Sequence, residues 1–137
     1  LASVVRPSSR TKSLEALAEL VDAKCRPLCI HYERPPVRDC AAVIDGEASL
    51  ALLRVAQELV RNAVTHGEAL RVRVELDYDG STLSLRVRDD GRGLSQQELA
   101  QATGGLANAR GWLSERRGTL ELVPVARGTE LLATMAP

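Results

Sequence analysis

Apolar residues recur at helical spacing in two stretches of the first half of the chain. In the longer stretch, from about Glu47 to His66, leucine, valine and alanine cover one broad arc at 100° per residue, and polar residues fill the other arc. The pattern predicts a long amphipathic helix, which Gly67 is expected to end. A shorter helix is expected after Ser13, whose hydroxyl can cap its first turn.

The apolar period then changes from 3.6 residues to two. Strict alternation predicts strands over residues 70–78 and 83–89, and Asp79-Gly80 between them is a typical hairpin turn. Weaker patterns predict a strand over residues 28–33, a helical turn over 95–101, a helix over 104–117 and strands over 119–125 and 129–135. This order predicts an α+β fold, a two-layer α/β sandwich in which helices pack on one face of a mixed, mostly antiparallel sheet.

Composition places these elements in one globular domain. The 137 residues include 18 Lys+Arg and 18 Asp+Glu, shared equally between the two halves of the chain, so neither nucleic acid nor direct membrane contact is expected. Phenylalanine is absent, and the core is therefore expected to consist of leucine, valine and alanine. Residues 1–12 are expected to form an entry segment and residues 13–137 the domain. The first residue, Leu1, suggests a piece of a longer protein, and a monomer is expected.

Cysteine use and hydropathy point to a cytoplasmic location. Cys25, Cys29 and Cys40 lack a second pair of metal ligands, and we interpret them as buried reduced thiols. No stretch approaches the ~18 apolar residues of a membrane span, and no signal-peptide pattern opens the chain.

The first candidate for chemistry is a carboxylate in an apolar row. Counting by two from Val87 places Asp89 on the buried face of its strand, while Asp90 points to water. A buried carboxylate needs a hydrogen-bond donor, and Gly91 and Gly93 would let a flat ligand approach the backbone. The exocyclic amine of a purine is such a donor. The alternative is a polar loop that bends outward and uses its glycines for turn geometry.

The second and third candidates lie on the predicted helices. Glu58 and Asn62 are four residues apart on the border of the long helix, and His66 extends their row by a turn. An asparagine oxygen can bind Mg²⁺ and a carboxylate can act as a base, although a solvated helix edge would look the same. Residues 104–106 (Gly104, Gly105, Leu106) open a helix whose free amides could hold phosphate, or they form only a flexible loop.

In this order and spacing, the three groups resemble the ATP-binding catalytic domain of bacterial sensor histidine kinases, within the GHKL ATPase superfamily. The resemblance covers about residues 13–137 and looks most like kinases that partner NarL/LuxR-type regulators. It rests on an N box at 57–66, a first glycine box at 89–93, a second at 103–110 and the closing Gly128-Thr129.

The resemblance implies ATP and Mg²⁺ as cofactors and a phosphoryl transfer that depends on positioning and charge neutralisation. The γ-phosphoryl would pass to a histidine on a helical domain outside this chain, and then to a response regulator. The implied roles are adenine recognition by Asp89, Mg²⁺ binding by Asn62, base or water orientation by Glu58, phosphate contact by His66 or Arg61, pocket shape from Gly91, Gly93 and Gly105, and support of Asp89 or a water by Thr129.

Three departures keep other interpretations open. Thr103 stands where the second glycine box usually has glycine, the lid of about ten residues is short, and the phosphoacceptor helix is missing. His31 only superficially resembles a phosphoacceptor, because its segment is a predicted strand that ends at two prolines. A Ser/Thr kinase of the anti-sigma type and a non-catalytic nucleotide-binding module are the alternatives. Retention of Glu58, Asn62 and Asp89 argues against the second of these.

Overall fold

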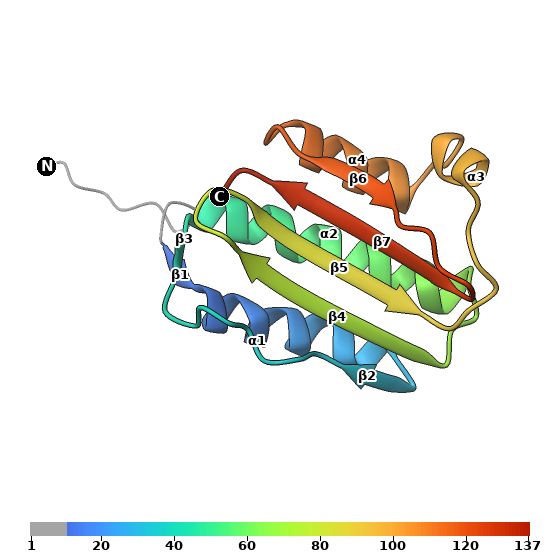
Figure 1. Cartoon of the computed structure of the whole chain (residues 1–137), viewed down its shortest axis with the longest axis horizontal. Coiled ribbons are helices and arrows are strands. Elements are labelled where there is room, and N and C mark those ends of the chain that lie inside the picture. Colours follow the sequence, from blue (N-terminus) through green and yellow to red (C-terminus); the bar gives the residue numbers. More distant parts are fainter. Residues whose placement is uncertain (1–10) are drawn as a thin grey trace, which may run out of the picture.

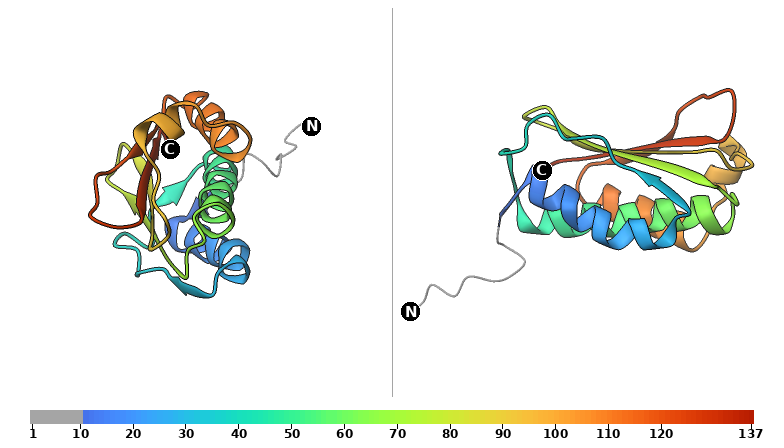
Figure 2. Two further views of the ribbon diagram at one scale, coloured as in Figure 1. Left: turned by 90° about the vertical axis from the view of Figure 1, so that its right-hand side faces the viewer. Right: turned by 90° about the horizontal axis from the view of Figure 1, so that it is seen from below.

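One sheet and one layer of helices make up the fold in a computed structural model that describes residues 11–137 (Figure 1). The sheet has the order β2 (His31–Glu33), β4 (Arg71–Tyr78), β5 (Leu83–Asp89), β7 (Thr129–Met135) and β6 (Thr119–Leu122). β2 runs parallel to β4, and the other neighbours are antiparallel. Helices α1 (Leu14–Cys25), α2 (Gly46–Thr65) and α4 (Gly105–Ser114) cover one face of the sheet (Figure 2). The predicted α+β sandwich is confirmed.

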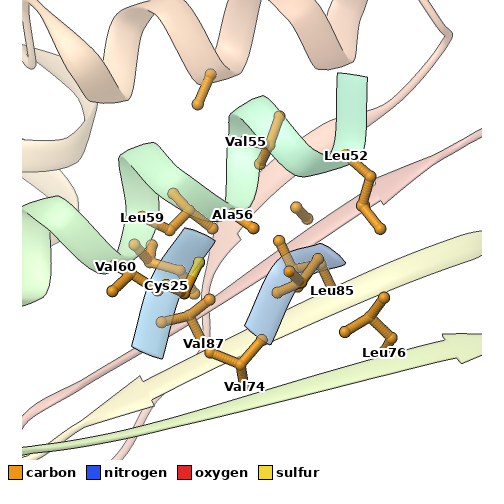
Figure 3. Packing of buried hydrophobic residues seen from close by; sticks show 14 of the residues in the cluster. Cys25, Leu52, Val55, Ala56, Leu59, Val60, Val74, Leu76, Leu85 and Val87 are labelled. Carbon is orange, nitrogen blue, oxygen red and sulfur yellow. The ribbon is translucent and has the colours of Figure 1, made fainter. Parts of the chain in front are cut away.

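Helix α2 is the central helix of the covered face. Its first turn is capped by the Asp45 carboxylate, which accepts hydrogen bonds from the amides of Glu47 and Ala48. Its apolar arc packs on the inward-facing residues of β4 and β5, and Figure 3 shows Val55 and Leu59 pointing toward the sheet residues Leu85 and Val87. Burial of this arc is the main stabilising contribution, because most of the stability of a helix in a protein comes from packing of its amphipathic face.

The β4–β5 hairpin fixes which residues face inward. Its register places Val74 opposite Val87 and Leu76 opposite Leu85, and all four are buried. The Asp79 carboxylate closes the turn by accepting hydrogen bonds from the amides at positions 81 and 82. Register is therefore set both by turn chemistry and by the need to bury one face.

The shorter elements differ from their predicted bounds. The strand expected over 28–33 is only His31–Glu33, because Arg26–Leu28 form the 3-10 turn η2 with Pro27 in its first turn. The helix expected to reach 117 ends at Ser114, and Arg117 adopts a positive φ of 56° in the turn that follows. β6 ends at Leu122 instead of 125, while the helical turn predicted over 95–101 is confirmed as α3 (Gln96–Ala100).

A second, two-stranded sheet was not predicted. β1 (Lys12–Ser13) pairs antiparallel with β3 (Val43–Ile44). Two residues per strand carry no alternation that a sequence pattern could reveal. The expected entry segment 1–12 lies outside the described residues up to position 10, and its Lys12 belongs to β1.

Candidate functional site

A cavity of about 340 Å³ lies where the end of α2 meets the end of β5, the start of β7 and the start of α4. The segment between β5 and α4, which contains α3, lies at the same end of the molecule (Figure 1). The residues that line the cavity come from all of these elements: Glu58, Arg61, Asn62, Ala63, His66, Gly67, Asp89, Arg92, Gly93, Leu94, Glu98, Ala102, Thr103, Gly105, Leu106 and Thr129. Eight of the ten predicted site residues therefore come together in one place.

Asp89 is the buried carboxylate of this cavity. It continues the inward row of β5 after Val87 and is only 8 % exposed, as its alternation predicted. Burial raises the pKa of its carboxyl group above the ordinary value, although the Gly91 amide donates a hydrogen bond of 2.7 Å to Oδ1. Thr129 is buried directly across from it on β7. A single backbone donor leaves acceptor capacity on this carboxylate for a ligand.

The α2 row reaches the same cavity from the other side. Glu58, Asn62 and His66 all line it, as their spacing of one helical turn predicted. Nη1 of Arg61 donates to Oε1 of Glu58 at 3.2 Å, and the Arg61 side chain is half exposed. An ion pair of this exposure contributes little free energy, so Arg61 can exchange its partner for an anionic ligand at small cost.

Helix α4 directs its N-terminus into the cavity. Gly104 is its N-cap with φ of 67°, and no side chain caps the first amides. A Cβ atom at Gly105 would displace the Oε2 end of the Glu58 side chain. The glycine therefore lets this carboxylate lie close to the helix start. The free amides and the helix dipole at this end favour negative charge.

Gly91 and Gly104 are the two predicted site residues that do not line this cavity. Gly91 contributes through its backbone amide on Asp89, and a Cβ atom there would clash with the carbonyl oxygen of Gly67. Gly104 contributes the left-handed turn into α4, while Gly105 and Leu106 form the wall.

The sequence pattern did not reveal Arg92 and Glu98 as members of the site. Nε of Arg92 donates to the carbonyl of His66 at 2.7 Å, and its Nη1 lies 3.7 Å from Oε2 of Glu98 on α3. Arg92 thereby connects the end of α2 to the lid, the segment 94–103 that contains α3. The lid is held further by Leu99, which is buried and whose carbonyl accepts a hydrogen bond from Arg110 of α4. An arginine between two glycines looks like an exposed turn residue, so only its position after folding identifies it.

The oxygen atoms of the cavity suit a magnesium ion whose remaining coordination positions are filled by phosphate oxygens. Among residues 11–137, no group of three or more His, Cys, Asp or Glu side chains could hold a metal by itself. Asn62 and Glu58 supply an amide and a carboxylate oxygen one turn apart. Mg²⁺ is usually bound by one or two protein ligands together with phosphate and water, and this donor set matches that pattern.

The cysteines take no part in this cavity. Cys25 is buried, and burial raises the pKa of its thiol to about 12, so it stays protonated and unreactive. Cys40 is exposed, in contrast to the expectation that all three would be buried. Within the part of the chain that the structure describes, no helix combines the length and hydrophobicity needed to cross a bilayer.

Comparison with curated proteins finds sensor kinases. The chain is 31% identical over 120 residues to the sensor histidine kinase LiaS of Bacillus subtilis, and the match covers 85% of this chain and 32% of LiaS. It is 30% identical over 86 residues to the sensor protein VraS of Staphylococcus aureus, with 63% of this chain and 25% of VraS covered. The chain thus spans about a third or less of the length of these relatives.

Solved structures share the fold. The ATP binding domain of PrrB from Mycobacterium tuberculosis superposes with a TM-score of 0.73 at 20% identity, over 95% of this chain and 97% of that one. The histidine kinase domain of a blue-light activated kinase from Erythrobacter litoralis gives a TM-score of 0.72 at 18% identity, over 98% and 65% of the two chains.

Most of the chain matches a protein-family model. The model described as histidine kinase-, DNA gyrase B- and HSP90-like ATPase matches residues 47–136. This range contains α2, the strand end with Asp89 and the start of α4, which are the elements that build the cavity. The chain therefore belongs to the family of histidine kinase-, DNA gyrase B- and HSP90-like ATPases.

Proposed function

We propose that residues 13–137 form the ATP-binding catalytic domain of a sensor histidine kinase. The domain would transfer the γ-phosphoryl group of Mg·ATP to a histidine on a helical domain outside this chain, for relay to a response regulator. The observation that carries the proposal is the buried Asp89 carboxylate, which shares one cavity with Asn62 and Glu58.

The Asp89 end of the cavity suits an adenine base. The carboxylate has acceptor capacity to spare, and the exocyclic amine of adenine is a hydrogen-bond donor. Thr129 stands opposite Asp89 in the register and would hold it or a bridging water. Gly93 lies in the wall, and Gly91 keeps Asp89 in place through its amide. A base without the exocyclic amine would leave the buried Asp89 carboxylate without this hydrogen bond, which costs binding free energy. The site therefore favours adenine over such bases.

The α2 and α4 end of the cavity suits the phosphates. Asn62 would hold Mg²⁺, whose role when bound is to neutralise phosphate charge. Glu58 would orient the attacking group or accept its proton. Arg61 and His66 would face the phosphates, as would the amides at Gly105 and Leu106 next to the Gly104 cap. Catalysis by such a site consists of positioning and electrostatic stabilisation, with no covalent intermediate on this domain.

The relatives support the wider context of the proposal. Both are named as sensor proteins, one of them as a histidine kinase, which favours a histidine acceptor over the serine or threonine of an anti-sigma kinase. We infer that the partner regulator is of the NarL/LuxR type and that the domain works in the cytoplasm.

A calorimetric titration with a non-hydrolysable ATP analogue and Mg²⁺ tests the nucleotide site. Asp89→Asn should weaken binding at least about 100-fold, since the amide side chain presents a donor to the adenine amine. Asp77→Asn, on the same sheet but away from the cavity, is the matched control and should leave affinity unchanged. Circular dichroism checks that both variants are folded. Unchanged affinity in Asp89→Asn would reject the adenine site.

Phosphorylation of the complete parent protein with labelled ATP tests the reaction. A phosphohistidine is labile in acid and stable in alkali, whereas phosphoserine and phosphothreonine survive acid. Acid-labile label that disappears in Asn62→Ala supports the proposal. Acid-stable label would identify a Ser/Thr kinase, and bound nucleotide without any label would identify a non-catalytic module.

A further inference from the structure

A second cavity, of about 860 Å³, lies at the same end of the sheet and is lined by residues of η2, β2, β4, β5 and the β6–β7 loop. Residues 72 and 74 of β4 face the helices, so the alternate residues Arg71 and Arg73 face outward. Five arginines line this cavity, and they come from four separate parts of the chain: Arg26 of η2, Arg71 and Arg73 of β4, Arg88 of β5 and Arg127 of the β6–β7 loop.

The arginines are placed where they repel one another. The β4–β5 register sets Arg73 directly opposite Arg88, and like charges in such a cross-strand pair are destabilising. Two residues further along the same ladder, Glu75 stands opposite Arg86, which is the favourable arrangement. The unfavourable pair thus occurs at the cavity, while the favourable pair occurs away from it. Departures from favourable charge pairing of this kind are found at functional positions.

Carboxylates near the cavity neutralise only part of this cluster. Glu33 and Glu75 each pair with Arg73 at 2.8 Å, and the nearest carboxylate oxygen to Arg88 belongs to Glu130 at 3.9 Å. Glu130 makes its closer ion pair with Arg86. Within residues 11–137, neither Arg71 nor Arg127 takes part in a salt bridge. Several guanidinium groups therefore remain available to an anion.

Asp90, which lines the cavity together with the acidic residues Glu33 and Asp89, already has backbone partners. Its Oδ1 accepts hydrogen bonds from the amides of Leu70 at 2.8 Å and Arg71 at 2.9 Å. The carboxylate thus serves to join the end of β5 to the start of β4. The charge that faces the cavity is mainly that of the arginines.

The cavity also has an apolar wall. Ile30 is 67 % exposed at its edge, and Val72 and the ring of Tyr32 contribute to its lining. The guanidinium of Arg26 lies 4.8 Å from the centre of that ring, a cation–π contact that orients it. An apolar wall combined with a few convergent charged groups is characteristic of sites for small organic ligands.

We propose that this cavity binds a small organic anion that carries two or more phosphate or carboxylate groups on an apolar body. The planar forks of arginine match both oxyanions in paired hydrogen bonds, and the cluster offers several forks at once. The site adjoins the adenine end of the nucleotide cavity, because Asp89 lines both cavities, and it is distinct from the phosphate end, because Asn62, Glu58 and the start of α4 do not line it. It goes beyond the proposed kinase function and does not depend on it.

Heteronuclear NMR of the full chain, without nucleotide or metal, tests this site with two probes. Inorganic pyrophosphate and tricarballylate distinguish phosphate from carboxylate chemistry. We expect saturable shifts at Arg71, Arg88 and Arg127 with at least one probe. The double variant Arg88→Gln/Arg127→Gln should weaken that binding at least about tenfold. The control Arg38→Gln/Arg54→Gln removes the same charge away from the cavity and should change affinity less than about twofold.

Other outcomes would overturn the proposal. Shifts that do not saturate, or equal weakening in the control, would mean non-specific attraction to charge. Pyrophosphate shifts confined to Arg61, His66 and Gly105 would mean binding in the nucleotide cavity only. Binding of a hexa-aspartate peptide but of neither small anion would mean that the arginines dock an acidic protein segment.

Discussion

The inward row of β5 has two ends with opposite uses. At one end Leu83 and Leu85 are fully buried in the core that the sheet forms with the helices, and Figure 3 shows Leu85 in this core. At the other end the same alternation brings Asp89 inward, where α2, α4 and the lid leave a cavity. One end gains stability by excluding water from apolar surface, and the other loses some by burying a charge. The inward-facing residues of one strand thus contribute both to the stability of the core and to the lining of the candidate ligand site.

The largest expected effects are changes of opposite sign in the free energy of unfolding when a residue at each end of the row is substituted. Leu85→Ala should lower the free energy of unfolding by about 3 kcal/mol, because a fully buried leucine leaves a cavity. Asp89→Asn should raise it by up to about 1 kcal/mol, because it removes a buried charge and keeps the acceptor for the Gly91 amide. Urea denaturation measures both. A destabilised Asp89→Asn would mean that the carboxylate supports the fold and not only the ligand.

A smaller effect is expected at Asp90, which fixes the strand end that carries Asp89. Asp90→Ala removes the acceptor of two backbone amides and should weaken ATP-analogue binding about tenfold, with a stability loss of about 1 kcal/mol at this exposed site. Hydrogen exchange at Leu70 and Arg71 should accelerate. Asp90→Asn retains an acceptor oxygen and should restore most of the affinity. Wild-type affinity in the alanine variant would show that the link does not position Asp89.

The smallest expected effect is on how stability depends on pH, which should have opposite signs for Asp89 and Asp90. Burial raises the pKa of Asp89, so its ionisation costs folded-state stability as pH rises through that pKa. The stability advantage of Asp89→Asn should therefore shrink as pH falls from 7 toward 4. Backbone amides, first that of Arg71, hold the pKa of Asp90 below its ordinary 3.8. Relative to Asp90→Asn, the wild type should lose stability as pH falls below that value. If the stability of the wild type and of each Asn variant changed equally with pH, the shifts in the pKa of Asp89 and Asp90 would be contradicted.

Long elements were predictable because their patterns repeat many times. The helix expected over 47–66 is Gly46–Thr65, and the strand over 83–89 is Leu83–Asp89. Short elements were not, since β1 and β3 have two residues each and depend on a partner about 30 positions away. The strand over 28–33 was overestimated because Pro27 extends a helical turn.

The candidate site divides in the same way. Asp89 was predicted to be buried because alternation alone decides its face, and Asn62 was predicted to lie one turn from Glu58. Arg92 and Glu98 were missed because their contact joins a glycine-rich turn to a lid helix. No periodicity within either segment records that contact.

The amino-acid sequence by itself determined which side chains turn inward, including the one carboxylate among leucines and valines. It did so because side-chain direction repeats every two or 3.6 residues along a single segment. Only the tertiary structure decided which inward and outward groups meet: Asp89 with the α2 row, and Arg73 with Arg88 on the open face. Those meetings depend on strand register and helix packing between segments far apart in the chain, where a shift of one residue would separate every pair.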